Sequence, residues 1–254
     1  MTDTRQVVVV TGGTRGVGAG IARSFLAAGA RVVICARRQP DKPVEEAGGT
    51  AEFRPLDLRD AAATGAFFAE VAAAYGRVDC LVNNAGGTPF GLLAESSPAR
   101  QAKIIELNLL APLHASLAAY EVMRHQESGG SITMIGSVSG TRPSPGSAAY
   151  GAAKAGLENL AGTMAVEWAP AVRVNTVVLG LARTESAALH YGDEDGIAEV
   201  ARTVPLGRLA DPSDVGDACV FLASDRARYI SGAALSLHGG GERPAFLAAA
   251  SVNR

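Results

Sequence analysis

Short apolar runs alternate with longer, alanine-rich amphipathic stretches along most of the chain. The short runs are rich in β-branched residues and too brief for helices, so they predict strands. The expected strands are 7–10, 31–36, 51–55, 79–83, 131–135, 172–178 and 233–237. The longer stretches predict helices over 17–28, 60–75, 98–126, 148–168 and 212–223. Gly29 is expected to stop the first helix, and Asp211-Pro212 to open the last one.

The alternation of strands and helices predicts a doubly wound α/β sheet with right-handed crossovers. The first strands are apolar throughout, which is typical of a parallel sheet covered by helices on both faces. Because no Pro/Ser linker or charge run divides the sequence, residues 1–254 are expected to form a single domain.

Two segments fall outside this pattern. Residues 180–205 are irregular and follow the carboxyl end of a strand, where ligands of such sheets bind. We interpret this segment as a substrate lid containing one or two short helices; a plain surface loop is the alternative. The C-terminal tail, 239–254, shows no clear periodicity, and it either covers a neighbouring subunit or is mobile.

Composition and charge narrow the class of protein. The net charge of −2 provides no general field that would attract nucleic acid or an anionic membrane. Cys35, Cys80 and Cys219 are odd in number and far apart, so they suggest buried apolar residues rather than disulfides, a zinc cluster or a reactive thiol. The polar N-terminus does not resemble a signal peptide, and no apolar run reaches the ~18 residues of a membrane span. We therefore expect a cytoplasmic protein without a bound metal.

Glycine is the one unusual component: the 30 glycines make up about 12% of the residues, against an ordinary ~7%. The densest group, Thr11-Gly12-Gly13-Thr14-Arg15-Gly16-Val17-Gly18 with Gly20 beyond it, links the first expected strand to the first helix. Glycines there let backbone N–H groups approach a pyrophosphate at the helix N-terminus. The loop thus predicts a dinucleotide site, the alternative being an ordinary tight turn.

The end of the second expected strand indicates which dinucleotide is bound. It reads Ile34-Cys35-Ala36-Arg37-Arg38, without the carboxylate that would accept a hydrogen bond from the ribose 2′-hydroxyl of NAD. Arg15 and Arg37 carry guanidinium groups suited to a 2′-phosphate. The sequence therefore favours NADP(H). If both arginines are merely solvated, NAD remains the alternative; Arg38 is left out of the site.

A tyrosine and a lysine lie four residues apart in the expected helix 148–168. Tyr150 and Lys154 therefore share one helical face. A nearby cation stabilises a phenolate, so Lys154 is expected to bring the pKa of Tyr150 down from ~10 toward neutral pH. Ser137 follows strand 131–135 at the same edge of the sheet. Taken singly, these residues would be a surface pair and a turn-capping serine.

Taken together, the motifs resemble those of the short-chain dehydrogenases/reductases. They are Thr11-Gly12-x-x-x-Gly16-x-Gly18, Asn83-Asn84-Ala85-Gly86, Asn108, Ser137, Tyr150-x-x-x-Lys154 and Asn175, in the order and spacing of that family. The resemblance covers about residues 6–241. It implies a Rossmann sheet of about seven strands and an oxidoreductase activity. Within the family, the chain resembles the NADP-dependent 3-oxoacyl reductase/hydroxysteroid dehydrogenase type.

The resemblance also implies catalytic roles. Tyr150 would be the general acid in carbonyl reduction and the base in alcohol oxidation. Lys154 would bind the nicotinamide ribose and lower the pKa of the tyrosine. Ser137 would hydrogen-bond the substrate oxygen, and Asn108 would hold a water in a proton relay that ends at Lys154.

The remaining site residues implied by the resemblance bind the cofactor. Val17 would donate its N–H to the pyrophosphate, Asp57 would accept a hydrogen bond from the adenine amino group, and Leu181 and Thr184 would contact the nicotinamide carboxamide and phosphate. With Tyr150 and Lys154, the implied set is Gly12, Thr14, Arg15, Gly16, Val17, Gly18, Arg37, Asp57, Leu58, Asn84, Ala85, Gly86, Gly180, Leu181 and Thr184.

Two positions depart from the family pattern. Leu179 stands where a proline is common, which changes the local backbone or adds an apolar substrate contact. His238 replaces a common aspartate and is expected to be structural, with a reach toward a neighbouring active site as the alternative. Among the other histidines, His190 in the expected lid is the one candidate for a substrate contact.

The expected reaction is hydride transfer between NADP(H) and a hydrophobic carbonyl or the matching secondary alcohol. An apolar lid suits a 3-oxoacyl thioester, a steroid-like ketone or a ring-fragment acyl-CoA, and its apolar residues are Leu179, Leu181, Ala187, Ala188 and Leu189. The alternatives are an NAD-dependent alcohol dehydrogenase of the same family and a non-catalytic dinucleotide sensor or assembly subunit. The resemblance implies a homotetramer that pairs helices 98–126 and 148–168, with apolar contacts from 161–168.

Overall fold

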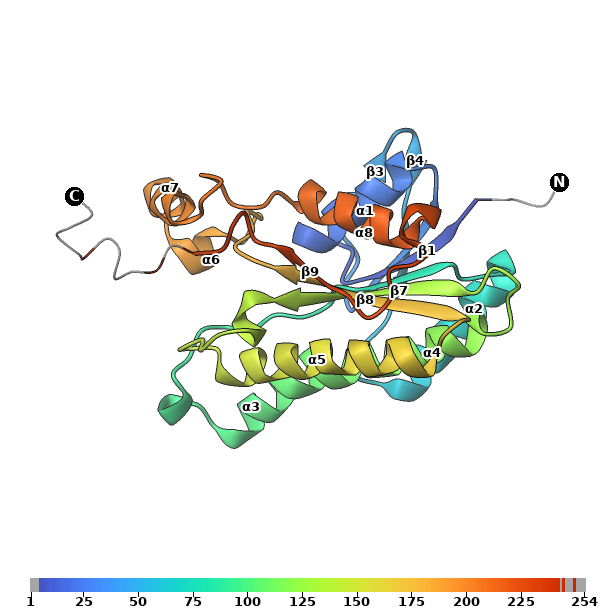
Figure 1. Cartoon of the computed structure of the whole chain (residues 1–254), viewed down its shortest axis with the longest axis horizontal. Coiled ribbons are helices and arrows are strands. Elements are labelled where there is room, and N and C mark those ends of the chain that lie inside the picture. Colours follow the sequence, from blue (N-terminus) through green and yellow to red (C-terminus); the bar gives the residue numbers. More distant parts are fainter. Residues whose placement is uncertain (1–4, 243, 245–248, 250–254) are drawn as a thin grey trace.

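The computed structural model describes residues 5–242, 244 and 249. Within this part of the chain, seven parallel strands form the central sheet (Figure 1). Their order across the sheet is β5-β2-β1-β6-β7-β8-β9. Every strand predicted from the sequence is present, so the predicted doubly wound sheet is confirmed. The bounds are β1 (Val7–Thr11), β2 (Arg31–Ala36), β5 (Glu52–Pro55), β6 (Cys80–Asn83), β7 (Gly130–Ser137), β8 (Val172–Leu179) and β9 (Ala234–Leu237).

The inner strands are apolar throughout because both of their faces are covered. Successive strand residues point to opposite sides of a sheet. In β1, Val7 and Val9 belong to one buried apolar cluster, whereas Val8 and Val10 belong to the other. All four side chains are buried. This arrangement explains why the sequence shows a continuous run there rather than alternation.

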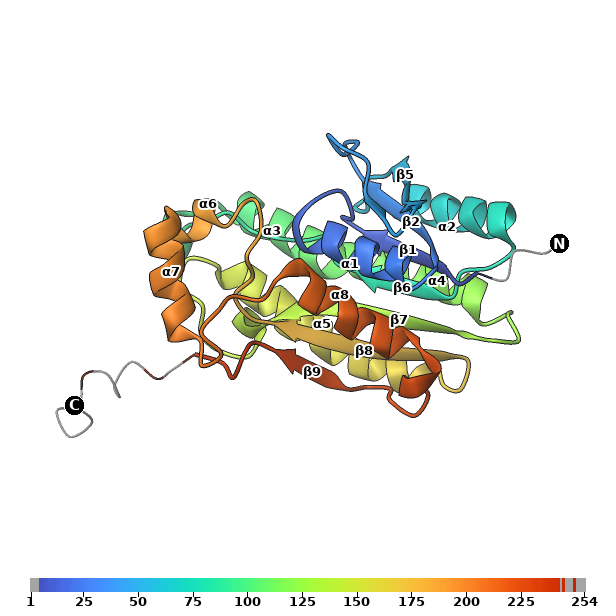
Figure 2. The ribbon, with the colours of Figure 1, turned by 90° about the horizontal axis from the view of Figure 1, so that it is seen from above.

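Helices α1 (Gly16–Ala27) and α8 (Pro212–Ala223) cover one face of the sheet, and α2 (Ala61–Tyr75), α4 (Ala111–Met123) and α5 (Ala148–Glu167) cover the other (Figures 1 and 2). The expected boundary signals are present. Gly29 follows α1 in the left-handed region, with a φ of 83°. Pro212 is the first residue of α8, and the N–H of Asp211 donates to the Asp214 carboxylate at 2.7 Å. The predicted ends of the helices are correct to within one residue, except that the helix predicted to end at 126 ends at Met123.

The predicted long helix over 98–126 is not continuous. It consists of α3 (Pro98–Ile105), a π-helical turn (Glu106–Leu110) and α4. Pro112 explains the interruption, since it has no N–H to donate to the carbonyl of Asn108 and its ring crowds that carbonyl. The side chain of Asn108 makes a hydrogen bond of its own, donating to the carbonyl of Ile104 at 2.9 Å. The wider turn directs Asn108 into the protein interior, where it is fully buried.

A small hairpin stands between β2 and β5 and was not predicted. Its strands β3 (Glu45–Glu46) and β4 (Gly49–Thr50) pair antiparallel and pack against α1. Ala47 and Gly48 form the turn with φ values of 50° and 77°. Two-residue polar strands have no hydrophobic period, so the sequence offered no signal for them.

The carboxyl ends of the strands point to the end of the molecule that carries α6 (Ala188–Tyr191) and α7 (Glu194–Thr203) (Figure 1). The chain runs from β1 outward through β2 to β5 and then returns to β6 beside β1, so the strand order reverses between β1 and β6. Ligands of open α/β sheets bind at this reversal. The predicted irregular segment 180–205 contains the two short helices. Most of the tail 239–254 lies outside the described residues.

The remaining sequence expectations concern cysteines, metals and membranes. Cys35, Cys80 and Cys219 are buried and free, as predicted, and burial raises the pKa of the Cys35 and Cys80 thiols to about 12. Among the described residues, no group of three or more His, Cys, Asp or Glu side chains is placed to hold a metal ion. None of the helices described is both long and apolar enough to cross a lipid bilayer.

Candidate active site

The glycine-rich loop lies in the crevice where the strand order reverses, and the loop after β6 holds it there. The hydroxyl oxygen of Thr11, at the end of β1, accepts hydrogen bonds from the N–H groups of Asn84 and Ala85, both at 3.0 Å. In return, the Asn84 side-chain amide donates to the carbonyls of Thr11 at 2.9 Å and Gly12 at 3.3 Å. Residues predicted for the cofactor site from two distant segments are thus in direct contact.

The loop has the form that a pyrophosphate requires. At Gly18, an added Cβ would lie 2.2 Å from the carbonyl oxygen of Gly12 and 2.4 Å from Nδ2 of Asn84. The backbone turns this tightly just where α1 begins, at Gly16, and the first N–H groups of a helix have no partner within it. These residues therefore fit a dinucleotide, whose phosphates would lie over the N-terminus of α1.

Around this loop, Arg15 and Arg37 are exposed at the carboxyl ends of β1 and β2, and Thr14 and Val17 are half-buried. Arg37 lies near enough to the Asp57 carboxylate to lower its pKa. The two arginines are thus free to turn toward a ligand at this edge of the sheet.

Asp57, predicted to meet the adenine, already has a partner that the sequence reasoning missed. The Arg59 side chain donates Nε–H to Oδ1 of Asp57 at 2.9 Å and also contacts Oδ2. This pairing holds the pKa of Asp57 at about 2, so the carboxylate is ionised and fixed in orientation. The Asp-x-Arg spacing was a readable signal for the pair. The side chain of Leu58 is buried in the core, so only its backbone is available to a ligand.

Ser137 and Tyr150 come together from β7 and α5. Ser137 ends β7, and its Oγ accepts a hydrogen bond from the N–H of Ser139 at 3.1 Å. The turn that Ser137 caps packs against α5, the helix that carries Tyr150. The Ser137 hydroxyl lies close enough to the Tyr150 phenol to lower its pKa. The serine therefore caps its turn and contacts the tyrosine at the same time.

Lys154 and Asn108 lie beside this pair. Lys154 is buried, its Nζ donates to the carbonyl of Ile135 at 2.7 Å, and it lies 5.6 Å from the centre of the Tyr150 ring. Asn108 exchanges two hydrogen bonds with the Gly87 backbone, at 2.8 and 3.0 Å. A Cβ placed on Gly86 would be 2.6 Å from Oδ1 of Asn108 and 3.5 Å from Nζ of Lys154. The four predicted catalytic residues thus surround one small space.

The pKa values in this space differ from the sequence expectation. Burial raises the pKa of the Tyr150 phenol, and the nearby Ser137 hydroxyl only partly offsets this rise. Burial also lowers the pKa of Lys154, to about 8. Lys154 therefore does not depress the pKa of Tyr150 here, because desolvation of the phenolate outweighs a cation that is directed toward a backbone carbonyl.

The segment after β8 runs along the same crevice. Gly180 donates its N–H to the carbonyl of Leu237 at 2.9 Å, and the carbonyl of Leu181 accepts from Ala210 at 2.9 Å. Thr184, predicted to contact the cofactor, lies against Gly16 of the glycine-rich loop. Leu179 is different: it packs in the core beneath α1 and α8, which favours the expected effect on the local backbone over a contact with substrate.

The segment 180–205 contributes to an apolar cluster of its own. Ala187, Ile197, Val204 and Leu209 are buried together, with Leu181 packed against them. These side chains stabilise the segment as a unit. Of the expected apolar lid residues, Ala188 and Leu189 remain exposed.

In the segment 180–205, a tyrosine rather than the histidine lies near Tyr150. Tyr191 is half-buried, and its pKa is raised by burial and by the nearby Tyr150 and Glu242. Glu242 forms an ion pair with Arg142, which follows the Ser137 turn. His190, the sequence candidate, is exposed. The aromatic residue in a segment of small side chains was the signal available for Tyr191.

His238 and Asn175 have structural surroundings. His238 packs against Gly180, and its Nδ1 is buried without a hydrogen-bond partner among the described residues. Asn175 is buried in β8; its side chain donates to the carbonyl of Ile230 at 2.9 Å and accepts from the N–H of Ala233 at 3.0 Å. Asn175 thus connects β8 to the loop that leads into β9.

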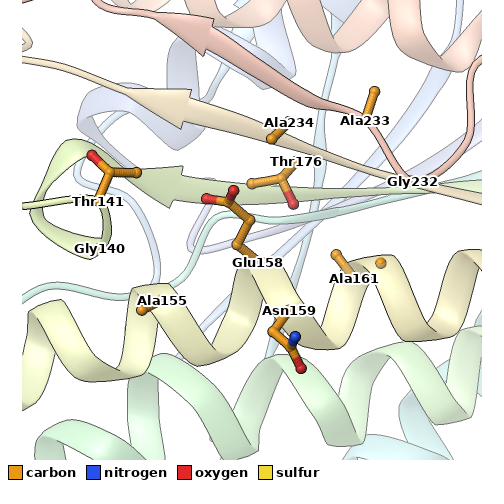
Figure 3. Close-up of a pocket in the computed structure, with 11 residues that line it drawn as sticks. Gly140, Thr141, Ala155, Glu158, Asn159, Ala161, Thr176, Gly232, Ala233 and Ala234 are labelled. Carbon is orange, nitrogen blue, oxygen red and sulfur yellow. The ribbon is translucent and has the colours of Figure 1, made fainter.

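An open groove of about 330 Å³ lies apart from these residues, between α5 and the edge of the sheet at β9. Figure 3 shows Glu158 extending from α5 toward that edge, while Asn159 points to the other side of the helix. None of the predicted site residues lines the groove. The candidate chemistry therefore belongs to the crevice at the carboxyl ends of the strands.

Known proteins with this sequence pattern and fold are oxidoreductases. A family model described as enoyl-(acyl carrier protein) reductase matches residues 12–242. The chain is 36% identical over 238 residues to the 3-oxoacyl-[acyl-carrier-protein] reductase of Escherichia coli, covering 92% of this chain and 96% of that protein. It is 34% identical over 245 residues to a 3alpha-hydroxysteroid dehydrogenase of Mediterraneibacter gnavus, with coverage of 92% and 96%. The ligand-free aldohexose dehydrogenase of Thermoplasma acidophilum superposes with a TM-score of 0.86 at 28% identity, over 93% of each chain.

Proposed function

The chain belongs to the short-chain dehydrogenase/reductase family of oxidoreductases, and we propose that it is an NADP(H)-dependent reductase of hydrophobic carbonyl compounds. Members of this family act on small molecules with a nicotinamide dinucleotide. The reverse reaction would oxidise the matching secondary alcohol. The observation that carries the proposal is the convergence of Ser137, Tyr150, Lys154 and Asn108 beside a loop that fits a dinucleotide.

In reduction, the nicotinamide supplies a hydride to the carbonyl carbon and the protein supplies the proton and the positioning. The Ser137 oxygen accepts a hydrogen bond from the N–H of Ser139, which orients the hydroxyl, and its proton would be donated to the substrate oxygen. Tyr150 donates the proton that completes the alcohol. Burial raises the pKa of Tyr150, so at neutral pH the phenol is protonated and holds the proton that reduction consumes.

Lys154 and Asn108 would restore the proton. The buried Lys154 ammonium, with its pKa lowered to about 8, is able to give up a proton more readily than an exposed lysine. It would also contact the ribose hydroxyls. Asn108 lies next to it across Gly86 and would hold a water that leads the proton in from solvent.

We expect NADPH to bind more tightly than NADH, by about tenfold or more, because Arg15 and Arg37 would form charge-assisted hydrogen bonds with the 2′-phosphate. The double variant Arg15→Ala/Arg37→Ala should lose this preference with little change in NADH binding. Arg23→Ala, which removes an exposed arginine from α1, is the matched control. Fluorescence titration of each protein with both cofactors measures the dissociation constants. Tighter binding of NADH by the unchanged protein would contradict the NADP assignment.

The substrate class is proposed from the segment 180–205, which we interpret as a lid over the catalytic crevice. Its exposed apolar residues and the aromatic, half-buried Tyr191 suit a hydrophobic carbonyl, such as a 3-oxoacyl thioester, a steroid-like ketone or a ring-fragment acyl-CoA. A screen of these three classes with NADPH, followed by absorbance, tests the reaction. NADPH binding without turnover of any carbonyl would favour a non-catalytic dinucleotide sensor.

We propose a homotetramer that uses the outer faces of the long helices. In the stretch 161–168, however, most of the apolar side chains pack inside the subunit. Val166 is the large apolar residue of this stretch that is exposed, with 80% of its surface accessible to solvent. Leu117 on α4 is half-exposed in the same layer. Val166→Arg should therefore shift the mass measured by light scattering to a smaller species, whereas Val166→Thr should not. An unchanged mass for the arginine variant would exclude this face as an interface.

A further inference from the structure

A carboxylate from the lid segment lies on the glycine-rich loop. Oε2 of Glu185 accepts a hydrogen bond from the N–H of Gly16 at 3.0 Å, across 169 positions of sequence. Thr184 packs against the same residue, since a Cβ on Gly16 would be 3.5 Å from its methyl group. Two consecutive lid residues thus contact the first residue of α1.

The position that Glu185 occupies is suited to an anion. Gly16 is the first residue of α1, so its N–H has no acceptor within the helix. The aligned peptide dipoles also give this end of the helix a partial positive charge, which favours a carboxylate as it would a phosphate. The sequence around residue 185 gives no indication of this contact, because the contact depends on how the segment 180–205 folds back over the crevice.

We propose that the Glu185 carboxylate competes with the cofactor's pyrophosphate for the backbone N–H of Gly16. In the cofactor-free protein the carboxylate accepts a hydrogen bond from this N–H, and cofactor binding displaces it. This inference rests on the proposed function only in that the loop must bind a dinucleotide. The side chain therefore lowers the affinity for either cofactor, and its displacement removes one contact between the lid and the loop.

The rest of the segment is anchored independently of Glu185. Residues before Glu185 are held independently: Arg183 donates its N–H to the carbonyl of Ala210 at 2.9 Å, and the carbonyl of Leu181 accepts from Ala210. The Arg183 side chain also pairs with Glu194 on α7. The residues that follow, 186–191, include α6, and Ala187 and Tyr191 pack into the apolar cluster of the segment. Displacement of Glu185 therefore removes one contact between this segment and the glycine-rich loop while the segment itself stays folded.

Binding of NADPH and NADH to the full-length protein and to three variants tests this proposal. Glu185→Ala should bind both cofactors about tenfold tighter, since a hydrogen bond to a charged group no longer competes. Glu185→Asp keeps the charge but is one methylene shorter, so it should also bind more tightly than the unchanged protein. Glu199→Ala removes an exposed carboxylate that pairs with Arg202 on α7, and its affinities should stay within twofold.

Amide hydrogen exchange of the cofactor-free proteins supplies a second measurement. The Gly16 N–H should exchange several times faster in Glu185→Ala than in the unchanged protein and Glu199→Ala. Equal exchange rates, or cofactor affinities of Glu185→Ala within twofold of the unchanged protein, would overturn the proposal. So would a Glu185→Asp variant that binds like the unchanged protein, because the effect would then be one of charge alone. If the unchanged protein and Glu185→Ala both bind neither cofactor, the proposed function fails as well.

Discussion

Replacing Tyr150 with phenylalanine is expected to lower kcat by about 10²–10⁴-fold, the usual contribution of a positioned general acid, while NADPH still binds. The reason is local: the phenol is the group that contacts Ser137 in the crevice and lies 5.6 Å, measured from its ring centre, from the Lys154 ammonium. Phenylalanine keeps the ring and its packing and removes the proton. The rate of NADPH consumption with the carbonyl found in the screen measures the effect.

Two measurements make this result specific. Tyr229→Phe, at a fully exposed tyrosine, should leave kcat and the NADPH dissociation constant unchanged. The NADPH titration of Tyr150→Phe separates a lost proton from a damaged cofactor site. If Tyr150→Phe retains more than a tenth of the activity, another group supplies the proton, and Tyr191, which lies near Tyr150, is the first to replace.

Local patterns in the sequence were enough to predict most of the fold. The strand positions followed from β-branched runs, since both faces of the sheet are covered and few polar residues interrupt them. The pairing of Tyr150 with Lys154 followed from helical spacing alone. The break at Asn108 was missed, although Pro112, four residues later, was the signal for it.

Features that depend on tertiary contacts were not predictable in this way. The direction of the Tyr150 pKa depends on how far the phenol is desolvated, which spacing within one helix does not reveal. The contact of Glu185 with Gly16 joins segments at opposite ends of the chain. Leu179 looked like a substrate contact because it starts the segment after β8, but the pairing of β8 with β9 directs it into the core.

Gly18→Ala is expected to weaken NADPH binding by more than about 100-fold and to lower the free energy of unfolding by about 1–3 kcal/mol. The added methyl would lie 2.2 Å from the carbonyl oxygen of Gly12, which is backbone and has no side-chain freedom with which to move away. Relief requires the loop to open, and opening breaks the hydrogen bonds of the Asn84 amide with Thr11 and Gly12. The N–H groups at the start of α1 then no longer converge on one phosphate position.

The chain contains a matched control for this substitution. Gly65 lies on the exposed side of α2, where an added Cβ meets nothing within 4 Å, so Gly65→Ala should gain up to about 1 kcal/mol from helix propensity and leave NADPH binding unchanged. Urea unfolding and NADPH titration of both variants measure the two effects. A Gly18→Ala protein that binds NADPH within threefold of the unchanged protein would mean that the phosphates do not lie on this loop. Glu185 contacts the same loop, so if the phosphates do not lie there, Glu185 has no pyrophosphate to compete with. The proposal for Glu185 would then fail as well.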